Sequence, residues 1–524
     1  MFSKIKKLVI KTHFFFILDK NERQFIRFCK NKWGRRSRSK TNGEILVDVI
    51  GFHPYIFQTA YTSNFLSGES GFSLKTVDTT YSPKFLFLKK YFYRFSKLRK
   101  LYHSFGCSDG LNYTNLSGKA LDACEDEAVL LLQGVKTKAD IVDLEFRNIK
   151  VGDLIYDTYL RSHNCETVDL EDNRLLSLVK SAVMIFYSCE LYLNSHPVKK
   201  VILSHSVYIQ YGILARLAVS KNIAVYMFSK WNTQVVHKLS ESHDLHTTNH
   251  RQYKKKFRLL DDKKKRLDQA KAKLLQRLSG EIDPGISYVK RSAYNSNIEF
   301  SDNVMKQTGR LRVVIFLHCF YDSPHIYKTM LFPDFYEWLD FTLKVLEKTG
   351  FDIYVKPHPG GLAGNEQVVE EFSNKYPDVT FIDKYVLNNQ LIGEGLDAAI
   401  TVYGTLGHEF SYKGVPVITA GENPHSAYSF CNHATTTGEY VSLLSNADKL
   451  PKEISKAEIE QFYYMHYLNV GDGRLDGDND IFNIGNIKER TDSLALLLKA
   501  EENGEFNDVD TFFRRALNQV DCLD

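Results

Sequence analysis

The sequence lacks the paired cysteines, long apolar runs and one-sided charge that mark several specialised classes of protein. Its 8 cysteines include no CxxC pair, so their spacing fits neither a zinc site nor a disulfide framework and favours reduced thiols in the cytoplasm. No apolar run approaches the roughly 20 residues that a membrane-spanning helix needs. The net charge of +5 over 524 residues is small and does not argue for a nucleic-acid partner.

The N-terminus also lacks the pattern of a secretion signal. Lys4, Lys6 and Lys7 precede an apolar stretch, Phe14–Leu18, which is short and has no small-residue cleavage site. A plain solvated helix is the simpler interpretation, and a peripheral contact with the cytoplasmic face of the inner membrane is the alternative. Residues 1–40 are basic as a whole and are predicted to form a flexible lead-in.

Two α/β domains are predicted, because a chain of this length is too long for one core. Runs rich in β-branched residues indicate buried parallel strands, and they alternate with helix-period stretches. The first domain covers 41–250, with strands at 45–50, 200–205 and 223–228, a helix at 211–219 and an inserted helical region at 81–105. The second covers 311–440, with strands at 313–317, 351–355, 379–382, 398–402 and 416–419 and helices at 335–348, 366–375 and 388–393. This order is typical of a doubly wound, Rossmann-like sheet.

Helices are predicted to connect the two domains and to follow the second. Leucines recur at helical spacing among lysines over 251–278, which predicts one long helix in a connector of 251–310 that ends at Gly280. Its charge is interpreted as a solvated face in preference to an anion-binding arm. Residues 441–524 have helical character at 453–468, 486–500 and 509–520, and this tail is expected to pack back across both domains.

The clearest candidate site follows strand 351–355 of the second domain. Open α/β sheets bind ligands beyond the carboxyl ends of their strands. There the sequence reads Lys356-Pro357-His358-Pro359-Gly360, and the prolines restrain the backbone on both sides of His358. An ammonium and an imidazole at one strand end suit a phosphoryl oxygen. A structural turn whose histidine is satisfied by backbone is the alternative.

A second candidate turn, Tyr403-Gly404-Thr405-Leu406-Gly407-His408-Glu409, follows strand 398–402. Glycines permit close approach of the backbone to a ligand, and a helix that begins near Thr405 would point N–H groups outward. Thr405 is expected both to cap that helix and to donate its hydroxyl to an anion. Glu409 either holds a ribose hydroxyl or stabilises the helix through its dipole.

Other polar groups at strand ends complete the predicted site. His318, Asp322 and His325 follow the first strand of the second domain, and His425 follows its last. They are expected to line the cleft; a metal site is the weaker interpretation, because no fourth ligand is evident. In the first domain, Asp153 and Asp157 are candidate bases, although helix caps or a domain interface explain them equally well. His205, at a strand end, is expected to face the cleft.

Three segments in this order, HCFYDSPH, VKPHPG and TVYGTLGHEFSYKGVPVI, resemble bacterial capsule and surface-polysaccharide glycosyltransferases of GT-B architecture. The likeness is to Kdo transferases and, more distantly, to bacterial sialyltransferases, with weaker matches at GDLIYDTYLR and VILSHSVYIQYG. In that group a His-Pro motif and a Ser/Thr-bearing turn bind the phosphate of a CMP-sugar. Here they match His358-Pro359 and Thr405, with Tyr403. The sialyltransferases' paired acids followed by glycine have no counterpart, since the acidic stretch Asp122–Glu127 lacks the glycine.

The resemblance implies a glycosyltransferase with two Rossmann-like domains facing a cleft. Its donor would be a nucleotide sugar, such as CMP-Kdo, and its acceptor a growing surface polysaccharide or lipopolysaccharide. No cofactor beyond this co-substrate and no metal are expected, because fixed donors take the metal's role. Asp157, Asp153, Asp322 and His205 remain the candidate catalytic residues. A teichoic-acid-type polyol-phosphate transferase and a non-catalytic glycan-assembly protein are the alternatives, and a nucleotide-sugar 2-epimerase is less favoured.

Overall fold

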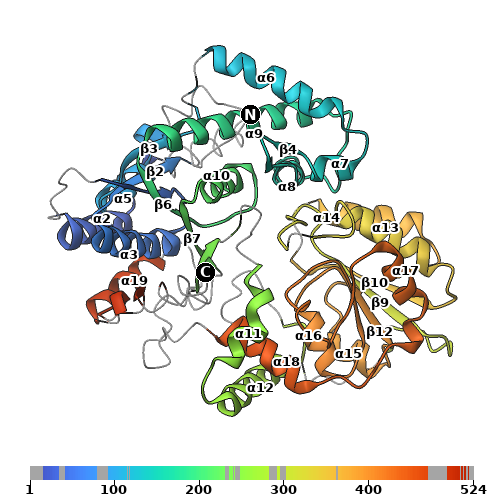
Figure 1. Cartoon of the computed structure of the whole chain (residues 1–524). Helices are drawn as coiled ribbons and strands as arrows, with labels where there is room; N and C mark the ends of the chain where they lie inside the picture. Colours follow the sequence, from blue (N-terminus) through green and yellow to red (C-terminus); the bar gives the residue numbers. More distant parts are fainter. Residues whose placement is uncertain are drawn as a thin grey trace, which may run out of the picture.

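The computed structural model contains two six-stranded sheets, each flanked by its own helices (Figure 1). The residues it describes are 16–34, 42–78, 93–114, 116, 118–229, 235–239, 241, 248–281, 292–295, 302–327, 329–360, 364–469, 493–504, 506, 507, 509–511, 513, 514 and 517.

The first sheet has the strand order β3-β2-β1-β6-β7-β8. Its pairs are parallel except for the last, β7 with β8. The three predicted strands are confirmed as β1, β6 and β7, each of which contains consecutive buried apolar residues. The bounds are Glu44–Asp48 for β1, Ser73–Asp78 for β2, Ser108–Asn112 for β3, Val198–Leu203 for β6, Ala224–Ser229 for β7 and Val235–Leu239 for β8.

The second sheet is entirely parallel, with the order β11-β10-β9-β12-β13-β14. All five predicted strands are present, displaced by a residue or two at their ends. The bounds are Arg312–Phe316 for β9, Asp352–Lys356 for β10, Thr380–Phe381 for β11, Ala398–Thr401 for β12, Val417–Ala420 for β13 and Asn432–Ala434 for β14. The two sheets therefore confirm the predicted fold class of two Rossmann-like domains.

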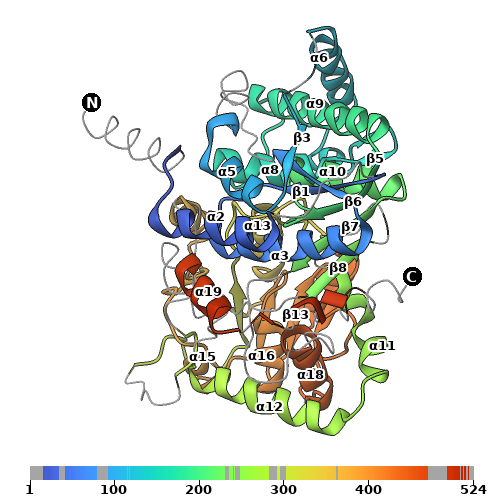
Figure 2. The ribbon, with the colours of Figure 1, turned by 90° about the vertical axis from the view of Figure 1, so that its left-hand side faces the viewer.

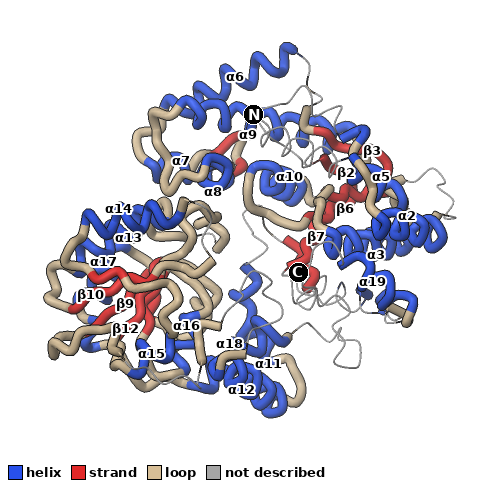
Figure 3. The backbone as a smooth tube through the Cα atoms, turned by 180° about the vertical axis from the view of Figure 1, so that it is seen from behind, coloured by secondary structure: helices blue, strands red, loops and turns tan. Residues whose placement is uncertain are grey.

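Helices cover both faces of each sheet (Figure 3). In the first domain they are α3 (His53–Ser70), α5 (Lys97–Ser104), α6 (Gly118–Gln133), α7 (Lys138–Val142), α8 (Gly152–His163), α9 (Asn173–Ser195) and α10 (Ile209–Ser220). In the second they are α13 (Phe335–Leu346), α14 (Asn365–Lys375), α15 (Asn388–Gly393), α16 (Leu406–Tyr412) and α17 (Thr437–Ser445). Helix α9 is long and apolar enough to cross a membrane by length and composition, but 61% of its most apolar stretch is buried in this domain. Its packing against α6 and α10 accounts for its apolar character.

Two predictions about the chain outside the sheets need correction. The 1–40 region is not a lead-in throughout, because α2 (Lys20–Trp33) begins with an Asp19 capping box and buries Phe25 and Cys29 completely. The connector is not one long helix but two, α11 (Tyr253–Arg258) and α12 (Lys263–Ser279). The break falls at Asp262, whose φ of 49° is left-handed.

The C-terminal tail packs against both domains, as predicted. Helix α18 (Lys456–Tyr463) lies against α12 and α16, whereas α19 (Ser493–Glu502) lies against α2 and α3 of the first domain (Figure 2). A short π-helical turn, Tyr464–Leu468, follows α18. Of the third predicted helix, 509–520, only part falls within the described residues, as do only parts of the predicted insertion at 81–105.

The carboxyl ends of the two sheets meet. Tyr208 lies in the loop after β6, and Ser323 lies in the loop after β9. The Ser323 hydroxyl donates to the Tyr208 hydroxyl at 3.3 Å. The Tyr403 hydroxyl, after β12, donates to the Ser323 carbonyl oxygen at 3.2 Å. The loops that bind ligands in such sheets are therefore side by side across the two domains.

Candidate active site

Lys356 places a cation at the end of β10, as the sequence predicted. Its side chain is buried, and its ammonium donates to Asn388 Oδ1 at 2.6 Å. Burial lowers the pKa of the ammonium to about 8, although Glu409 and Asp383 act to raise it. Asn388, at the start of α15, was not foreseen, because nothing in its local sequence marks it as the partner of a distant lysine.

His358 and His318 lie close enough to influence each other. The Gly360 N–H donates to His358 Nδ1 at 3.0 Å, so in the neutral ring the proton is on Nε2. Burial, and then Lys356, lower the pKa of His358, while Asp322 raises it. His318 accepts from the Tyr403 N–H at 3.3 Å, and burial together with His358 lowers its pKa to about 3. Both imidazoles are thus neutral near pH 7 and act as dipoles and hydrogen-bonding groups, not as charges.

The turn after β12 has the predicted glycine but not the predicted cap. Gly404 has a φ of +135°, a conformation that other residues rarely adopt, and faces His318. Thr405 occupies the N-cap position of α16, yet its side chain makes no capping hydrogen bond. That part of the prediction is wrong. The hydroxyl, which is partly exposed, is not committed to the helix.

Three other residues predicted to bind the donor are turned into the protein instead. His408 and His425 are buried, and their ring nitrogens Nδ1 and Nε2 lie 3.2 Å apart in an aromatic cluster with Phe462 of α18. A Cβ on Gly407 would meet the His425 ring at 2.6 Å, so this glycine serves packing. Sequence spacing could not show that α18 covers this side of α16.

Glu409 is also buried and engaged through both oxygens. Arg277 Nε of α12 donates to Oε1 at 2.5 Å, and the Tyr294 hydroxyl donates to Oε2 at 3.0 Å. The proposed ribose contact is therefore not supported, and neither is a simple dipole effect. Glu409 joins the connector to the second domain and lies near enough to Lys356 to favour its charged form.

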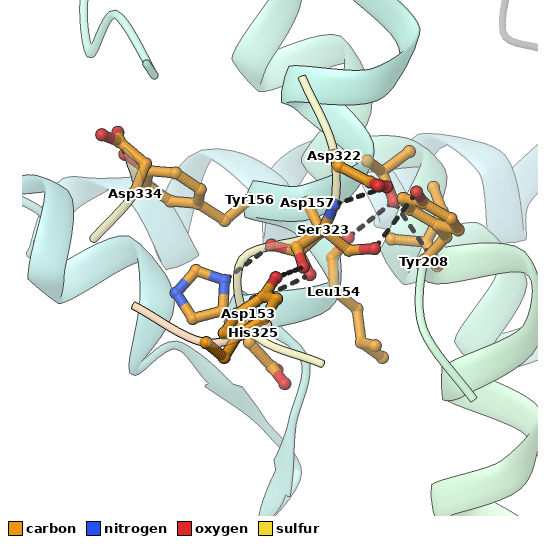
Figure 4. Close-up of polar contacts among 12 residues, drawn as sticks. Asp153, Leu154, Tyr156, Asp157, Tyr208, Asp322, Ser323, His325 and Asp334 are labelled. Atoms are coloured by element: carbon orange, nitrogen blue, oxygen red, sulfur yellow. Dashed lines mark hydrogen bonds and ion pairs between the residues drawn. The ribbon is translucent and has the colours of Figure 1, made fainter. Parts of the chain in front are cut away.

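The two acids of α8 are occupied, which corrects their assignment as candidate bases. Asp153 makes a bidentate ion pair with Arg216 at 2.7 and 2.6 Å, and both side chains are buried. Asp157 crosses to the second domain, where its Oδ1 lies 2.6 Å from His325 Nδ1 (Figure 4). Burial raises the pKa of Asp157 to about 6, while His325 acts to lower it. His325 is therefore an interdomain contact and not a phosphate ligand.

Asp334 adds a second interdomain contact that the sequence did not reveal. It is buried before α13, whose Glu337 N–H it caps at 2.8 Å. Its Oδ2 accepts from the hydroxyl of Tyr156, which lies beside it in Figure 4, at 2.5 Å. The same oxygen accepts from the Thr167 hydroxyl at 2.6 Å, and both partners are in the first domain. Only the N-cap role is readable from sequence, because the other partners lie more than 160 residues away.

Asp322 is the candidate carboxylate that remains exposed where the domains meet. It raises the pKa of His205 in the first domain and that of His358 in the second, in both cases against burial, which lowers it. Figure 4 shows it beside Tyr208 and Ser323. Tyr208 has a φ of 65° and ψ of 152°, a conformation that is strained for a tyrosine. Among the sequence-predicted residues, Asp322 thus acts electrostatically on both His205 and His358, and Lys356 acts on His358.

Two Rossmann-like domains whose carboxyl edges face each other define the GT-B class of architecture. No protein-family model matches the chain, and no curated protein matches it. Among solved structures, it is similar to a β-Kdo 2,4 transferase, KpsC of Thermosulfurimonas dismutans (16% identity, 52% of this chain and 81% of that one, TM-score 0.32). It is also similar to a UDP-GlcNAc 2-epimerase of Neisseria meningitidis (10% identity, 86% and 99%, TM-score 0.23) and to the calicheamicin glycosyltransferase CalG4 (13% identity, 91% and 99%, TM-score 0.20).

The sequence predicted a resemblance to Kdo transferases, and a Kdo transferase is among the solved structures that resemble this chain. TM-scores of 0.32 and below do not carry an activity from those proteins to this one.

Proposed function

We propose that the protein is a glycosyltransferase that moves a sugar from a nucleotide-activated donor to a glycan acceptor. The observation that supports this most is that groups suited to a phosphate and a carboxylate suited to accepting a proton both occur where the sheets meet. The second domain contributes Lys356, His358 and the Thr405 hydroxyl, which suit the phosphate of a donor. The exposed carboxylate Asp322 acts on both His358 and His205 of the first domain, and it would deprotonate an acceptor hydroxyl there.

In the proposed reaction, the acceptor oxygen forms a bond to the anomeric carbon while the bond from that carbon to the phosphate oxygen breaks. Asp322 takes the proton of the acceptor hydroxyl. Negative charge develops on the departing phosphate, and Lys356 and His358 stabilise it as fixed donors. A CMP-sugar such as CMP-Kdo is our preferred donor, on the resemblance of the His358-Pro359 motif alone.

A thermal-shift panel of CMP, CDP, UDP and GDP tests the proposal, because a ligand that binds only the folded protein raises its melting temperature. We expect CMP to stabilise the wild type and to have little effect on His358→Ala. Asp143→Asn, a change at an exposed site in the first domain, is the control and should respond like the wild type. If none of the four nucleotides shifts the melting temperature, the proposal fails.

A further inference from the structure

The first sheet has a switch point between β1 and β6, which are neighbours although they are far apart in sequence. Ligands of doubly wound sheets bind beyond the strands at such a point. Asp48 is the last residue of β1, and Ser204 directly follows β6. The Ser204 N–H and hydroxyl both donate to Asp48 Oδ2, at 2.7 and 2.5 Å. The two strand ends are therefore tied together by one carboxylate oxygen.

The other oxygen of Asp48 is not satisfied in the same way. Asp48 is 0% exposed, and no described residue hydrogen-bonds its Oδ1. Burial raises the pKa of Asp48 to about 7, although Ser204 acts to lower it. A buried carboxylate with an unbonded oxygen is unfavourable for folding. Packing alone does not explain why an acid occupies this position.

Asp153, in the same domain, shows the contrast. Both of its oxygens pair with Arg216, and although burial acts to raise its pKa, the guanidinium lowers it overall. That arrangement stabilises a permanent charge inside the domain. Asp48, by comparison, can gain or lose a proton near neutral pH while it continues to hold Ser204.

Ser204 links this carboxyl to the meeting point of the domains. His205 is the next residue, and burial lowers the pKa of its imidazole. A hydrogen bond with the Ser204 backbone and the charge of Asp322 both act to raise that pKa. Hydrogen bonds thus tie Asp48 to Ser204, the residue before His205, and the charge of Asp322 in the second domain acts on the His205 ring.

We propose that Asp48 is a positioning residue that acts through Ser204, fixing the turn after β6 so that His205 faces Asp322. Held there, the imidazole orients the hydroxyl of a polyhydroxylated acceptor toward the carboxylate that deprotonates it. This role in transfer rests on the proposed function. The coupling between Asp48 and His205 does not, because it is a property of the ligand-free protein.

The coupling can be measured by NMR of the full chain labelled with ¹³Cε1-histidine, without ligand. The His205 signal is the one that His205→Gln removes. In the wild type we expect it to titrate with two inflections, its own and that of Asp48 near pH 7. Asp48→Asn keeps an oxygen that can accept from Ser204 but cannot titrate near neutrality. It should therefore preserve the position of the signal and abolish the second inflection.

Asp48→Ala removes the carboxylate that holds Ser204, so it should move the His205 signal and raise the pKa of His205 toward its ordinary value. Asp143→Asn should change neither the signal nor the pKa. A His205 titration that is the same in the wild type, Asp48→Asn and Asp48→Ala would overturn the inference. Should Asp48→Ala not fold, Asp48→Asn decides alone: persistence of the second inflection overturns the inference, and its loss supports it. A failure of all nucleotides to bind would refute the proposed function and leave this result untouched.

Discussion

The carboxyl edges of the two sheets face each other but are built from opposite chemistry. The second edge presents a buried ammonium and two neutral imidazoles, Lys356, His318 and His358, against loops restrained by proline and glycine. The first edge presents a buried carboxyl, Asp48, and a histidine that it holds through Ser204. The second edge is suited to an anion, and its exposed carboxylate, Asp322, acts on His205 of the first edge. In the proposed function, the donor phosphate therefore lies at the second edge, and the acceptor hydroxyl lies between Asp322 and His205.

The largest expected effect comes from removing the carboxylate between the edges. Asp322→Asn should reduce turnover by about 10²–10⁴-fold, the usual contribution of a general base. Nucleotide affinity should stay within a factor of two or so, because the side chain is exposed and no phosphate role is assigned to it. Turnover and nucleotide affinity, measured on the same preparation, check this. Loss of affinity with turnover intact would reverse the assignment.

A buried acid in the first domain should behave in the opposite way. Asp153→Ala leaves the buried Arg216 guanidinium without its partner and should lower the free energy of unfolding by about 3–5 kcal/mol. Asp322→Ala should change it by less than about 0.5 kcal/mol. Urea denaturation of both variants makes the comparison. Equal losses would show that the two carboxylates do not differ as described.

Asp48 should make stability depend on pH in a direction opposite to that of a paired carboxylate. Its pKa is about 7 in the folded protein and about 3.9 when unfolded. The folded state therefore binds the proton more tightly than the unfolded state. The contribution of Asp48 to the free energy of unfolding is fully present below about pH 4 and is lost as the pH rises through about 7.

Asp48→Asn should remove this dependence and raise the free energy of unfolding at pH 8 by about 1–4 kcal/mol relative to the wild type. Melting curves at pH 5 and pH 8 test the prediction. A variant that is less stable than the wild type at pH 8 would contradict it.

On the second edge, His358→Ala should weaken binding of the donor nucleotide by about 10–100-fold, since a hydrogen bond to a charged group contributes about 1.5–3 kcal/mol. The side chain is fixed by a local backbone contact, so the melting temperature without ligand should hardly change. Isothermal titration calorimetry gives the affinity. Wild-type affinity in this variant would remove the histidine from the phosphate site.

Thr405→Ala should have the smallest effect. The hydroxyl makes no helix cap, so stability should be unchanged. Loss of one hydrogen bond to the donor should weaken nucleotide affinity by about tenfold or less. Thr405→Ser is the matched control, because it retains the hydroxyl, and it should bind like the wild type.

The strands of both edges were predictable because each is a run of buried apolar residues, and so were Lys356 and His358, which follow one of them directly. Strands β2 and β3 were missed, since Ser73–Asp78 and Ser108–Asn112 carry polar residues at most positions. The roles of the acids were not predictable. Asp153 and Asp157 are occupied by Arg216 and His325, and the two members of each pair lie far apart in sequence. The role of Asp48 was not predicted, because it lies within an apolar run whose sequence indicates only a buried strand.

The account is tested most directly by the product of the reaction. The protein is incubated with CMP-Kdo and an oligosaccharide acceptor, and the product is analysed by mass spectrometry. We predict an acceptor that has gained one sugar residue and no phosphorus, with no product from Asp322→Asn. A product that has gained phosphorus, or an unchanged acceptor from a protein that binds the nucleotide, would contradict the transfer of a sugar between these two edges.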